Sequence, residues 1–317
     1  MSTITARGGN ARLAACFETN YGTIPSSPAG ILLPINSSKI AVKQNLIESA
    51  TITGRRDPVQ AGRGNIDVSG NVVVPIDQVA IGHWLRGMFG DPTTTGTGPY
   101  THKFTLGNTQ KSLAFEQQFP DVNTYELFNG CKISKFSMAL ALNNSELTGS
   151  IDIMGAKRTL GSSPFSSTLT DIALNRFSAF QGSVEEGGSA IATVVSADMN
   201  IDFGLDGDTF ALGSNGVRAD LVEGIVKVTG TIKALFQNTT LLNKAINNTE
   251  SSLKLKLNSG ATSLEFFMEE VMYEQTSPGI EGSKGIFIEL PYRAYYQNGT
   301  GNSVIVATLI NTQAAYV

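Results

Sequence analysis

The sequence predicts a mainly β protein made of two tandem antiparallel β-barrel or sandwich domains, each with one short α-helix and a long loop between strands. Three observations support this prediction. Alternating apolar stretches recur along the whole chain, helical periodicity is confined to two short segments, and one strand-into-helix pattern occurs twice. We place the first domain at residues 1–160, including an N-terminal arm at 1–38, and the second at residues 161–317, ending in a C-terminal strand.

Strand patterns dominate the chain. They are rich in Val, Ile, Thr and aromatic residues, and Gly, Asn and Ser separate them. The clearest lie at residues 40–53, 132–142, 147–156, 251–257, 285–296 and 302–310. In the fourth of these, leucines alternate with lysines, which is typical of an antiparallel strand with one buried face.

Helical patterns are few. The best candidate has a single apolar stripe at helical spacing, formed by Ile81, Trp84, Leu85 and Met88. Asp77 precedes this stripe as a candidate N-cap, and Gly90 follows it where a C-terminal glycine belongs. A second, weaker helix is expected at residues 239–249.

A strand-into-helix pattern is repeated within the chain. Residues 64–77 have a counterpart at residues 224–237, displaced by 160 positions. Apolar residues and one glycine coincide in the pairs Ile66 and Val226, Val68 and Val228, Gly70 and Gly230, Val72 and Ile232, and Val74 and Ala234. The order of elements favours a tandem duplication over chance similarity between β patterns.

The repeat extends beyond these two stretches. Residues 49–53 match 196–201 upstream, and residues 112–119 match 263–270 downstream. With this alignment, the connection between the first two strands is longer by 13 residues in the second half. Its additional residues lie in the segment 202–224, and such loops commonly carry contacts.

A Ser/Thr-rich segment at residues 158–171 is the candidate boundary between the two domains. The halves on either side carry opposite charge, since residues 1–160 sum to +3 and residues 161–317 to −7. This difference could steer a head-to-tail contact between subunits, or it could be ordinary scatter among solvated residues.

The overall composition excludes several classes of protein. Charged residues make up only 16% of the 317 residues, the net charge is −4, and the sequence has no run of Lys and Arg. We therefore do not expect the protein to bind nucleic acid electrostatically. The only cysteines, Cys16 and Cys131, cannot form a disulfide framework, although one bridge between them stays open. We expect folding in a reducing cytoplasm, no secretory signal and no membrane insertion.

No catalytic constellation is found, and we expect neither an enzyme nor a cofactor. The two histidines read as ordinary residues, His83 in the first helix and His102 at a solvated strand start. Asp202, Asp206 and Asp208 surround a glycine as calcium ligands would, but their spacing departs from that of an EF-hand loop, so no metal is expected.

Three segments near the N-terminus resemble the major tail tube proteins of long, non-contractile-tailed (siphovirus-type) bacteriophages. They read FETNYGTIPSSP at residues 17–28, ATITGRRDPVQAGRGNIDVSGNVVVPID at residues 50–77, and GHWLRGMFG at residues 82–90. The resemblance covers the first part of the chain well and the remainder loosely.

The resemblance implies two tail-tube-type domains in a structural protein of the virion tail, made in the bacterial host cytoplasm. Its rings would stack into a tube around a tape-measure protein, between the distal tail proteins and the tail terminator, and double-stranded DNA would pass without specific binding. The implied contact loops between rings or subunits contain Gly54, Arg55, Arg56, Asp57, Asp202, Asp206, Asp208 and Arg218. Candidate positions facing the lumen are Asn65, Asp67, Ser69 and Asn71, on the polar side of their strand.

Two tube domains per chain favour a ring of three chains over a ring of six. Two other functions stay open at this point. One is another self-assembling β protein of a virion or a cell surface, and the other is a carbohydrate-binding β-sandwich module of a tail. The second would need exposed aromatic platforms, and Trp84 is the only indole in the sequence.

Overall fold

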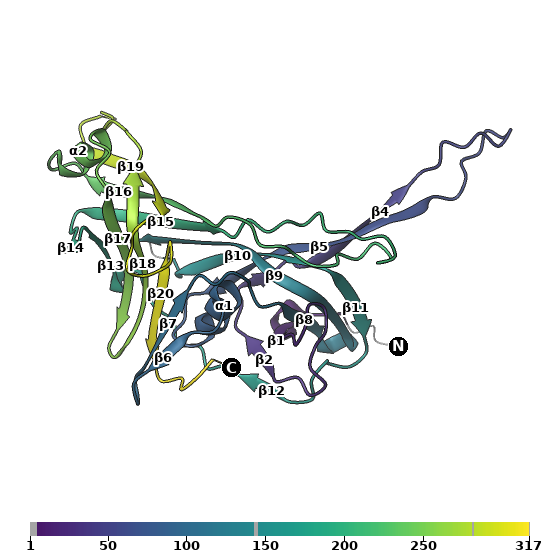
Figure 1. Cartoon of the computed structure of the whole chain (residues 1–317). Helices are drawn as coiled ribbons and strands as arrows, with labels where there is room; N and C mark the ends of the chain where they lie inside the picture. Colours follow the sequence, from purple (N-terminus) through teal and green to yellow (C-terminus); the bar gives the residue numbers. More distant parts are fainter. Residues whose placement is uncertain (1–4, 143–144, 281, 317) are drawn as a thin grey trace.

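The computed structural model describes residues 5–142, 145–280 and 282–316, and it is mainly β with two short helices (Figure 1). The helices are α1 (Ala80–Phe89) and α2 (Thr240–Ile246). The strands of the first half are β1 (Arg12–Phe17), β2 (Gly30–Leu33), β3 (Ser37–Ser38), β4 (Ala41–Ile47), β5 (Gly62–Pro75), β6 (Thr93–Thr95), β7 (Tyr100–Thr105), β8 (Leu113–Phe119), β9 (Thr124–Ala141), β10 (Thr148–Gly155), β11 (Lys157–Gly161) and β12 (Leu169–Asp171). Those of the second half are β13 (Gly182–Glu186), β14 (Ser189–Ala190), β15 (Val194–Asp202), β16 (Lys227–Leu235), β17 (Ser251–Ser259), β18 (Thr262–Tyr273), β19 (Phe287–Tyr295) and β20 (Val306–Asn311).

The strands join into one large sheet that does not close into a barrel, so the barrel form of the prediction does not apply. From β4 the neighbours run through β5, β10, β9, β15, β16 and β19 to β18. The seam between the halves is the pairing of β9 with β15, in which Lys135 to Ala141 lie opposite Asp202 to Ser196. Because β15 gives its outer edge to β9, that edge is not free to close the second half on itself.

The two halves have the same strand order. In the first half it is β4-β5-β10-β9-β8-β1, and in the second half it is β15-β16-β19-β18-β17-β13. The hairpins β8–β9 and β17–β18 also share a register shift, between Leu113 and Phe115 in one and between Ser251 and Leu253 in the other. Equivalent irregularities at equivalent places go beyond the general likeness of β hairpins.

The glycines of the repeated pattern have the same packing role. A Cβ on Gly70 would lie 2.3 Å from the carbonyl oxygen of Lys39, and one on Gly230 would lie 2.1 Å from that of Asp198. The backbone just before β4 in the first half, and that of β15 in the second, comes so close that only glycine fits. The Tyr292 hydroxyl donates a hydrogen bond of 2.9 Å to the Asp198 carbonyl beside Gly230.

Strand pairing corrects the rest of the sequence alignment. Ala41 lies opposite Ser69 and Asn200 lies opposite Thr229, so β4 corresponds to β15, and residues 49–53 do not correspond to 196–201. In the same way β8 corresponds to β17, so the match of residues 112–119 with 263–270 is wrong as well. A shared Ser-Leu start misled the comparison because short β sequences are alike in composition.

The expected insertion of 13 residues in the second half is therefore wrong. Ala41 and Ser69 are 28 positions apart, and Asn200 and Thr229 are 29 positions apart. The two connections have nearly equal length and differ in conformation. In the first connection, β4 and β5 stay paired as a hairpin as far as Ile47 and Gly62. Strand β4 therefore ends before residue 53, where the sequence pattern placed its end. The second connection is a loop at residues 203–226.

Helix α1 lies at the centre of the first half. The Asp77 carboxylate accepts the backbone N–H groups of Val79, Ala80 and Ile81, at 2.7 to 3.2 Å, which satisfies the first turn as the sequence indicated. The helix is buried on nearly all sides and not on one stripe alone, because Tyr316 from the C-terminus covers the face around Gly82.

The C-terminal strand also reaches across the halves, since β20 pairs with β18 on one side and with β7 on the other. His102, in β7, is fully buried between the Thr94 hydroxyl and the Gln313 carbonyl, so the expected solvated position is wrong.

In the segment proposed as a boundary between domains, β11 and β12 pair with β9 and β2 of the first half. Buried residues from both halves belong to one core cluster. A division at residue 160 stays a prediction.

Candidate assembly surfaces

The most prominent surface feature is a hairpin arm, formed by β4, β5 and the connection at residues 48–61, which projects far beyond the rest of the chain (Figure 1). Its tip contains the predicted contact residues Gly54 to Asp57, all of them exposed. Arg55 and Asp57 form an ion pair of 2.6 Å at the tip. This pair is mostly exposed to solvent and so contributes little to the stability of the arm.

The arm exposes large apolar side chains. Ile52 has 94% of its surface accessible and Leu46 has 70%, and Ile47 is also mostly exposed. Burying each such side chain against another protein would contribute about 1.5 to 3 kcal/mol. An exposed edge strand with apolar residues is normally an aggregation risk, and apolar surface of this kind is typical of surfaces that another protein covers.

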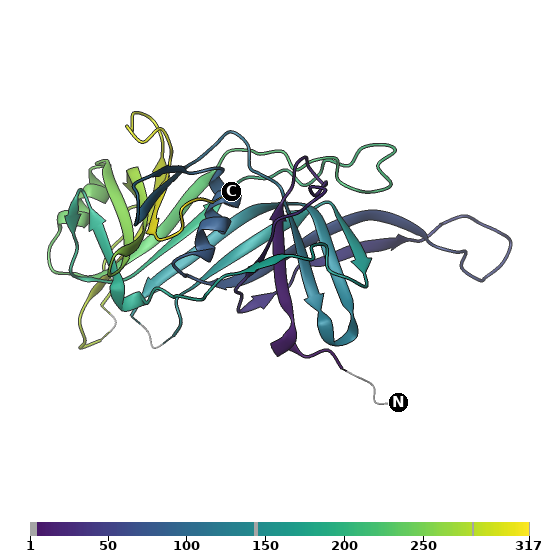
Figure 2. The ribbon, with the colours of Figure 1, turned by 90° about the horizontal axis from the view of Figure 1, so that it is seen from below.

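The second connection, residues 203–226, lies along β5 and extends toward the same end of the molecule as the arm (Figures 1 and 2). Arg218 fixes it there and has only 7% of its surface exposed. Its guanidinium forms an ion pair of 2.6 Å with Asp67 and donates to the carbonyls of Gly155 and Gly207. The Gly216 carbonyl accepts the N–H of Ile66. Arg218 is thus engaged within its own chain.

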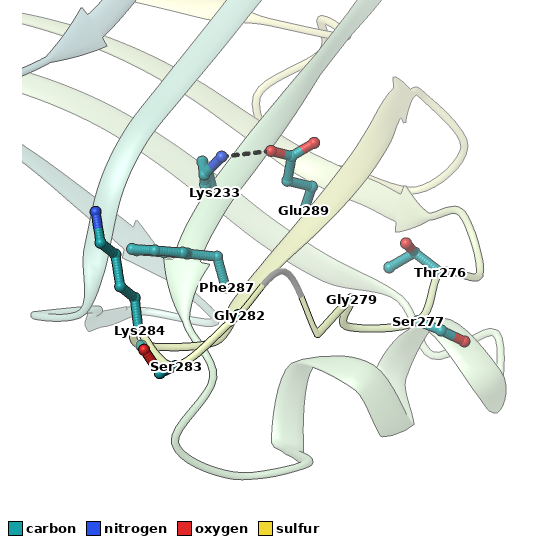
Figure 3. A pocket seen from close by; sticks show the side chains of 10 residues that line it. Lys233, Thr276, Ser277, Gly279, Gly282, Ser283, Lys284, Phe287 and Glu289 are labelled. Atoms are coloured by element: carbon teal, nitrogen blue, oxygen red, sulfur yellow. Dashed lines mark hydrogen bonds and ion pairs between the residues drawn. The ribbon is translucent and has the colours of Figure 1, made fainter.

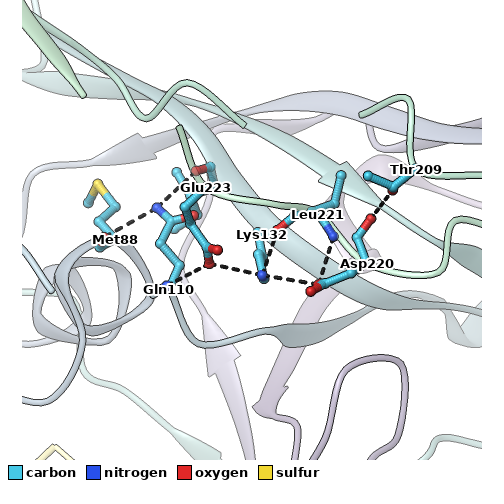
Figure 4. Close-up of polar contacts among 8 residues, drawn as sticks. Met88, Gln110, Lys132, Thr209, Asp220, Leu221 and Glu223 are labelled. Carbon is cyan, nitrogen blue, oxygen red and sulfur yellow. Dashed lines mark hydrogen bonds and ion pairs between the residues drawn. The ribbon is translucent and has the colours of Figure 1, made fainter. Parts of the chain in front are cut away.

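A second cluster holds the end of this loop (Figure 4). The Lys132 ammonium, largely buried in β9, donates to the Leu221 carbonyl at 2.7 Å and to the Glu223 carboxylate at 2.9 Å. The same Glu223 carboxylate accepts the backbone N–H of Gln110. Asp220 adds a longer ion pair with Lys132 of 3.2 Å. A buried cation with several partners is costly to disturb, so the loop is firmly attached to the first half.

The other acidic residues of this loop are less constrained. Asp206 accepts the N–H of Asp208 at 2.9 Å, as in a local turn, and both side chains are exposed. Asp202 contacts Lys135 across the seam at 3.4 Å. Within residues 5–142, 145–280 and 282–316, His, Cys, Asp and Glu side chains form no group of three that could hold a metal ion.

The outward face of the sheet carries small polar residues. Asn65 is exposed, and Asp67, Ser69 and Asn71 are half-buried, while Val68 and Val72 on the opposite face are buried. The Asn71 amide donates to the Ser150 hydroxyl and to the Asp152 carboxylate, both at 2.7 Å. The alternation predicted from the sequence is therefore present, and the Asp67 carboxylate is partly neutralised by Arg218.

Pairs of opposite charge span neighbouring strands at two places on this face. Besides the contact between Lys135 and Asp202, Lys233 of β16 and Glu289 of β19 are 2.7 Å apart. These surface pairs add little stability. Their effect is electrostatic, because a pair of opposite charges has no strong net attraction for a polyanion.

A trough with a volume of about 760 Å³ lies at the far edge of the sheet, where β18 and β19 separate (Figure 3). Lys233, Phe287 and Glu289 form one wall, and the other is formed by Thr276, Ser277 and Gly279 together with Gly282 to Gly285. The Glu274 N–H still reaches the Pro291 carbonyl, at 2.9 Å, and the strand pairing ends there. The trough is thus an opened hairpin beside a strand edge.

Buried titratable groups take part in packing. Burial lowers the pKa of His83 to about 4, and Arg86 contributes to this shift. Burial raises the pKa of Cys16 to about 12 and that of Cys131 well above its ordinary value, so both thiols stay protonated, and both cysteines are free. Trp84 is 2% exposed and stacks on Phe115, so it offers no platform for a sugar.

The surfaces described above have the form of assembly contacts. A family model described as phage tail tube protein matches residues 8–294. The chain belongs to the phage tail tube protein family. Among curated proteins, none matches the chain.

Membership gives this tail tube protein a structural, non-enzymatic role in the virion tail, where such proteins assemble with one another. The resemblance noted at residues 17–90 is thereby confirmed at the level of the family and extends over most of the chain. In the part of this tail tube protein that the structure describes, no helix is long and apolar enough to cross a membrane.

Proposed function

We propose that this protein polymerises as stacked rings into the tube of a long, non-contractile phage tail, which conducts the genome into the host at infection. The observation that carries the proposal is the seam between β9 and β15, where two halves with the same strand order share one sheet. A chain built in this way supplies two neighbouring sectors of a ring. Three chains would then make six sectors, with a tandem duplication as the origin of the halves.

The outward face of the sheet is suited to the lumen. Its side chains at Asn65, Ser69 and Asn71 are small and uncharged, and two pairs of opposite charge lie across its neighbouring strands. DNA moving along such a wall would meet no cluster of cations that retains phosphates. Double-stranded DNA would therefore pass without specific binding.

The hairpin arm is suited to contacts between stacked rings. Its tip, from Gly54 to Asp57, is solvated in the single chain, and Ile52 and Leu46 expose apolar surface that a neighbouring copy would cover. The partners of the finished tube would be the tape-measure protein inside it, the tail terminator at one end and the distal tail proteins at the other. The chain would be made in the host cytoplasm before it enters the virion.

The test is a cryo-EM reconstruction of tubes assembled from the purified protein. We expect rings of three chains with six similar sectors and a lumen faced by β5, β10, β9, β15 and β16. A reconstruction with six chains in each ring, each giving a single sector, would refute the trimeric ring. Purified protein that stays monomeric under all conditions of assembly would contradict the polymerisation itself.

A further inference from the structure

Asparagine is followed directly by glycine at three places in the sequence, which are Asn129–Gly130, Asn215–Gly216 and Asn298–Gly299. We propose that the second pair, in the loop at residues 203–226, is a site of spontaneous deamidation, and that its conversion loosens the hold of this loop on β5. A glycine after asparagine favours the reaction, because no Cβ shields the attacking backbone nitrogen. The structure distinguishes the three pairs by the groups that bind them.

The reaction consumes water and needs no enzyme, which is why asparagine counts among the thermolabile residues. The Gly216 nitrogen attacks Cγ of Asn215, a new C–N bond closes a succinimide ring, and the C–N bond of the side-chain amide breaks. The proton of the Gly216 N–H leaves with the amide nitrogen as ammonia. Water then opens the ring at either carbonyl and gives aspartate, or isoaspartate with its Cβ in the main chain. A reactive pair therefore needs a free backbone N–H and a backbone that can move.

The first pair is fixed within β9. The Glu18 carboxylate accepts the N–H of Gly130 at 2.8 Å and the Asn129 side-chain amide at 3.3 Å. Asn129 is only 5% exposed, and its carbonyl accepts the N–H of Ala156 at 2.9 Å. The attacking nitrogen is thus occupied and the backbone is held in the sheet, so this pair is protected as long as the sheet stays closed.

The third pair lies beside two carboxylates. Glu270 accepts the N–H groups of Gln297 and Asn298, at 2.6 and 2.8 Å, which fixes the backbone just before Gly299. The nearest atom to a Cβ built on Gly299 is a carboxylate oxygen of Glu269, at 2.8 Å. The reaction requires the glycine nitrogen to lose its proton, and a neighbouring negative charge opposes that loss. This pair should therefore react slowly.

The second pair has neither kind of protection. Asn215 is exposed, and no acceptor in the described part of the chain takes up the N–H of Gly216. The two residues have positive φ, 54° and 77°, in a turn that the Val217 N–H closes on the Ser214 carbonyl at 3.1 Å. The atoms nearest to a Cβ built on Gly216 belong to the residues at 64 and 65 and include no carboxylate. A turn closed by one hydrogen bond opens at small cost, and opening lets the nitrogen approach the side chain.

This pair lies at a contact that attaches the loop. The Gly216 carbonyl accepts the N–H of Ile66 at 2.8 Å, and Arg218 forms its ion pair with Asp67 at 2.6 Å. An isoaspartate at position 215 adds a carbon atom to the main chain directly before these two contacts. The spacing between the turn and its partners on β5 then no longer matches. We therefore expect the converted loop to detach from β5 more readily.

Peptide mapping by mass spectrometry tests the site. We would age the folded, full-length protein in mildly alkaline buffer, digest samples taken over time, and measure the conversion of each asparagine relative to protein that was not aged. Asn215 should convert about tenfold faster than Asn129 and Asn298, because a loop opens more easily than a sheet or a backbone held by carboxylates. Equal or faster conversion at either of the other two asparagines would overturn the proposal.

Limited proteolysis tests the effect on the loop. Aged protein should be cut within residues 203–226 about tenfold faster than fresh protein. The matched control is Asn215→Gly, which removes the reacting amide and suits the positive φ of this position. Ageing should leave its cleavage rate unchanged. If aged protein that carries the conversion at Asn215 were cut no faster than fresh protein, or if the Asn215→Gly variant loosened equally on ageing, deamidation would not be what releases the loop.

Discussion

Replacing either repeated glycine by alanine tests the equivalence of the two halves. A Cβ at position 70 would approach the Lys39 carbonyl oxygen to 2.3 Å and the Ile40 Cα to 2.5 Å. A Cβ at position 230 would approach the Asp198 carbonyl oxygen to 2.1 Å and the Tyr292 hydroxyl to 2.6 Å. Backbone atoms must move in both variants, because these contacts are far inside van der Waals distance.

The two costs should differ because the surroundings differ. At Gly70 the neighbouring strand has an open outer edge and can shift away, so overpacking should cost about 1 kcal/mol. At Gly230 the neighbouring β15 is held by β9 on its other side and Tyr292 closes the site, so the cost should be about 3 kcal/mol. Alanine regains about 0.5 kcal/mol in each variant by restricting the unfolded chain.

The assay is urea unfolding of the unassembled protein, followed by circular dichroism. Gly62→Ala is the matched control in β5, where the nearest atom to a new Cβ is 3.9 Å away, and it should leave the free energy of unfolding unchanged or slightly higher. If Gly230→Ala were as stable as Gly62→Ala, the close approach of β15 to β16 would be refuted. If Gly70→Ala lowered the free energy of unfolding more than Gly230→Ala did, β9 would not be preventing β15 from shifting away from residue 230.

Three further predictions concern the loop, the arm and a histidine. Arg218→Ala should expose residues 203–226 to limited proteolysis at least tenfold faster, with little change in global unfolding, whereas an unchanged cleavage rate would show that Arg218 does not hold the loop. Ile52→Ser should reduce tube formation, measured by light scattering, without changing the midpoint of urea unfolding, and unaltered tubes would exclude this side chain from the contact. The folded-state pKa of His83 is lowered to about 4, so its neutral form stabilises the fold above pH 6.5 and this contribution is lost as the pH falls from 6.5 to 4. The unfolding free energy of the unsubstituted protein should therefore fall relative to that of His83→Gln over this range, and a constant difference would contradict the lowered pKa.

Sequence patterns correctly predicted those strands and helix ends that depend on residues close together in the chain. Alternation located β5 and β16, and the carboxylate of Asp77 satisfies the first turn of α1 as its position in the sequence indicated. The pairing of Gly70 with Gly230 was also visible, because a glycine required by a close backbone approach leaves a mark in the sequence. These features depend on neighbours along the chain or on the nearest strand.

Other expectations were wrong where residues distant in the sequence determine whether a side chain is buried. His102 was expected in solvent and is buried by Thr94 and by the C-terminal segment at Gln313. The apolar stripe of α1 suggested one buried face, but Tyr316 covers the opposite face as well. Nothing in the local sequence of either residue reports a contact more than 200 positions away.

Of the two candidate contact surfaces, one could be predicted from the sequence and the other could not. The family resemblance placed Gly54 to Asp57 in a contact loop, and the structure places them at the exposed tip of the arm, where the contact stays a prediction. The loop containing Arg218 has a similar composition, but it is attached to the first half through Asp67 and Lys132. Sequence composition could not distinguish a free loop from an attached one, because the partners of Arg218 are distant in the chain.

The sequence by itself determined a β protein with a repeated strand-into-helix unit, because side-chain alternation and required glycines are local properties. Only the tertiary structure decided how the two units join. The pairing of β9 with β15 makes one continuous sheet, and it leaves the β4 edge and the trough beside β19 open at its two ends. Strand edges are satisfied by backbone hydrogen bonds, which are the same for every residue, so the choice of partner strand is settled by packing across the whole fold.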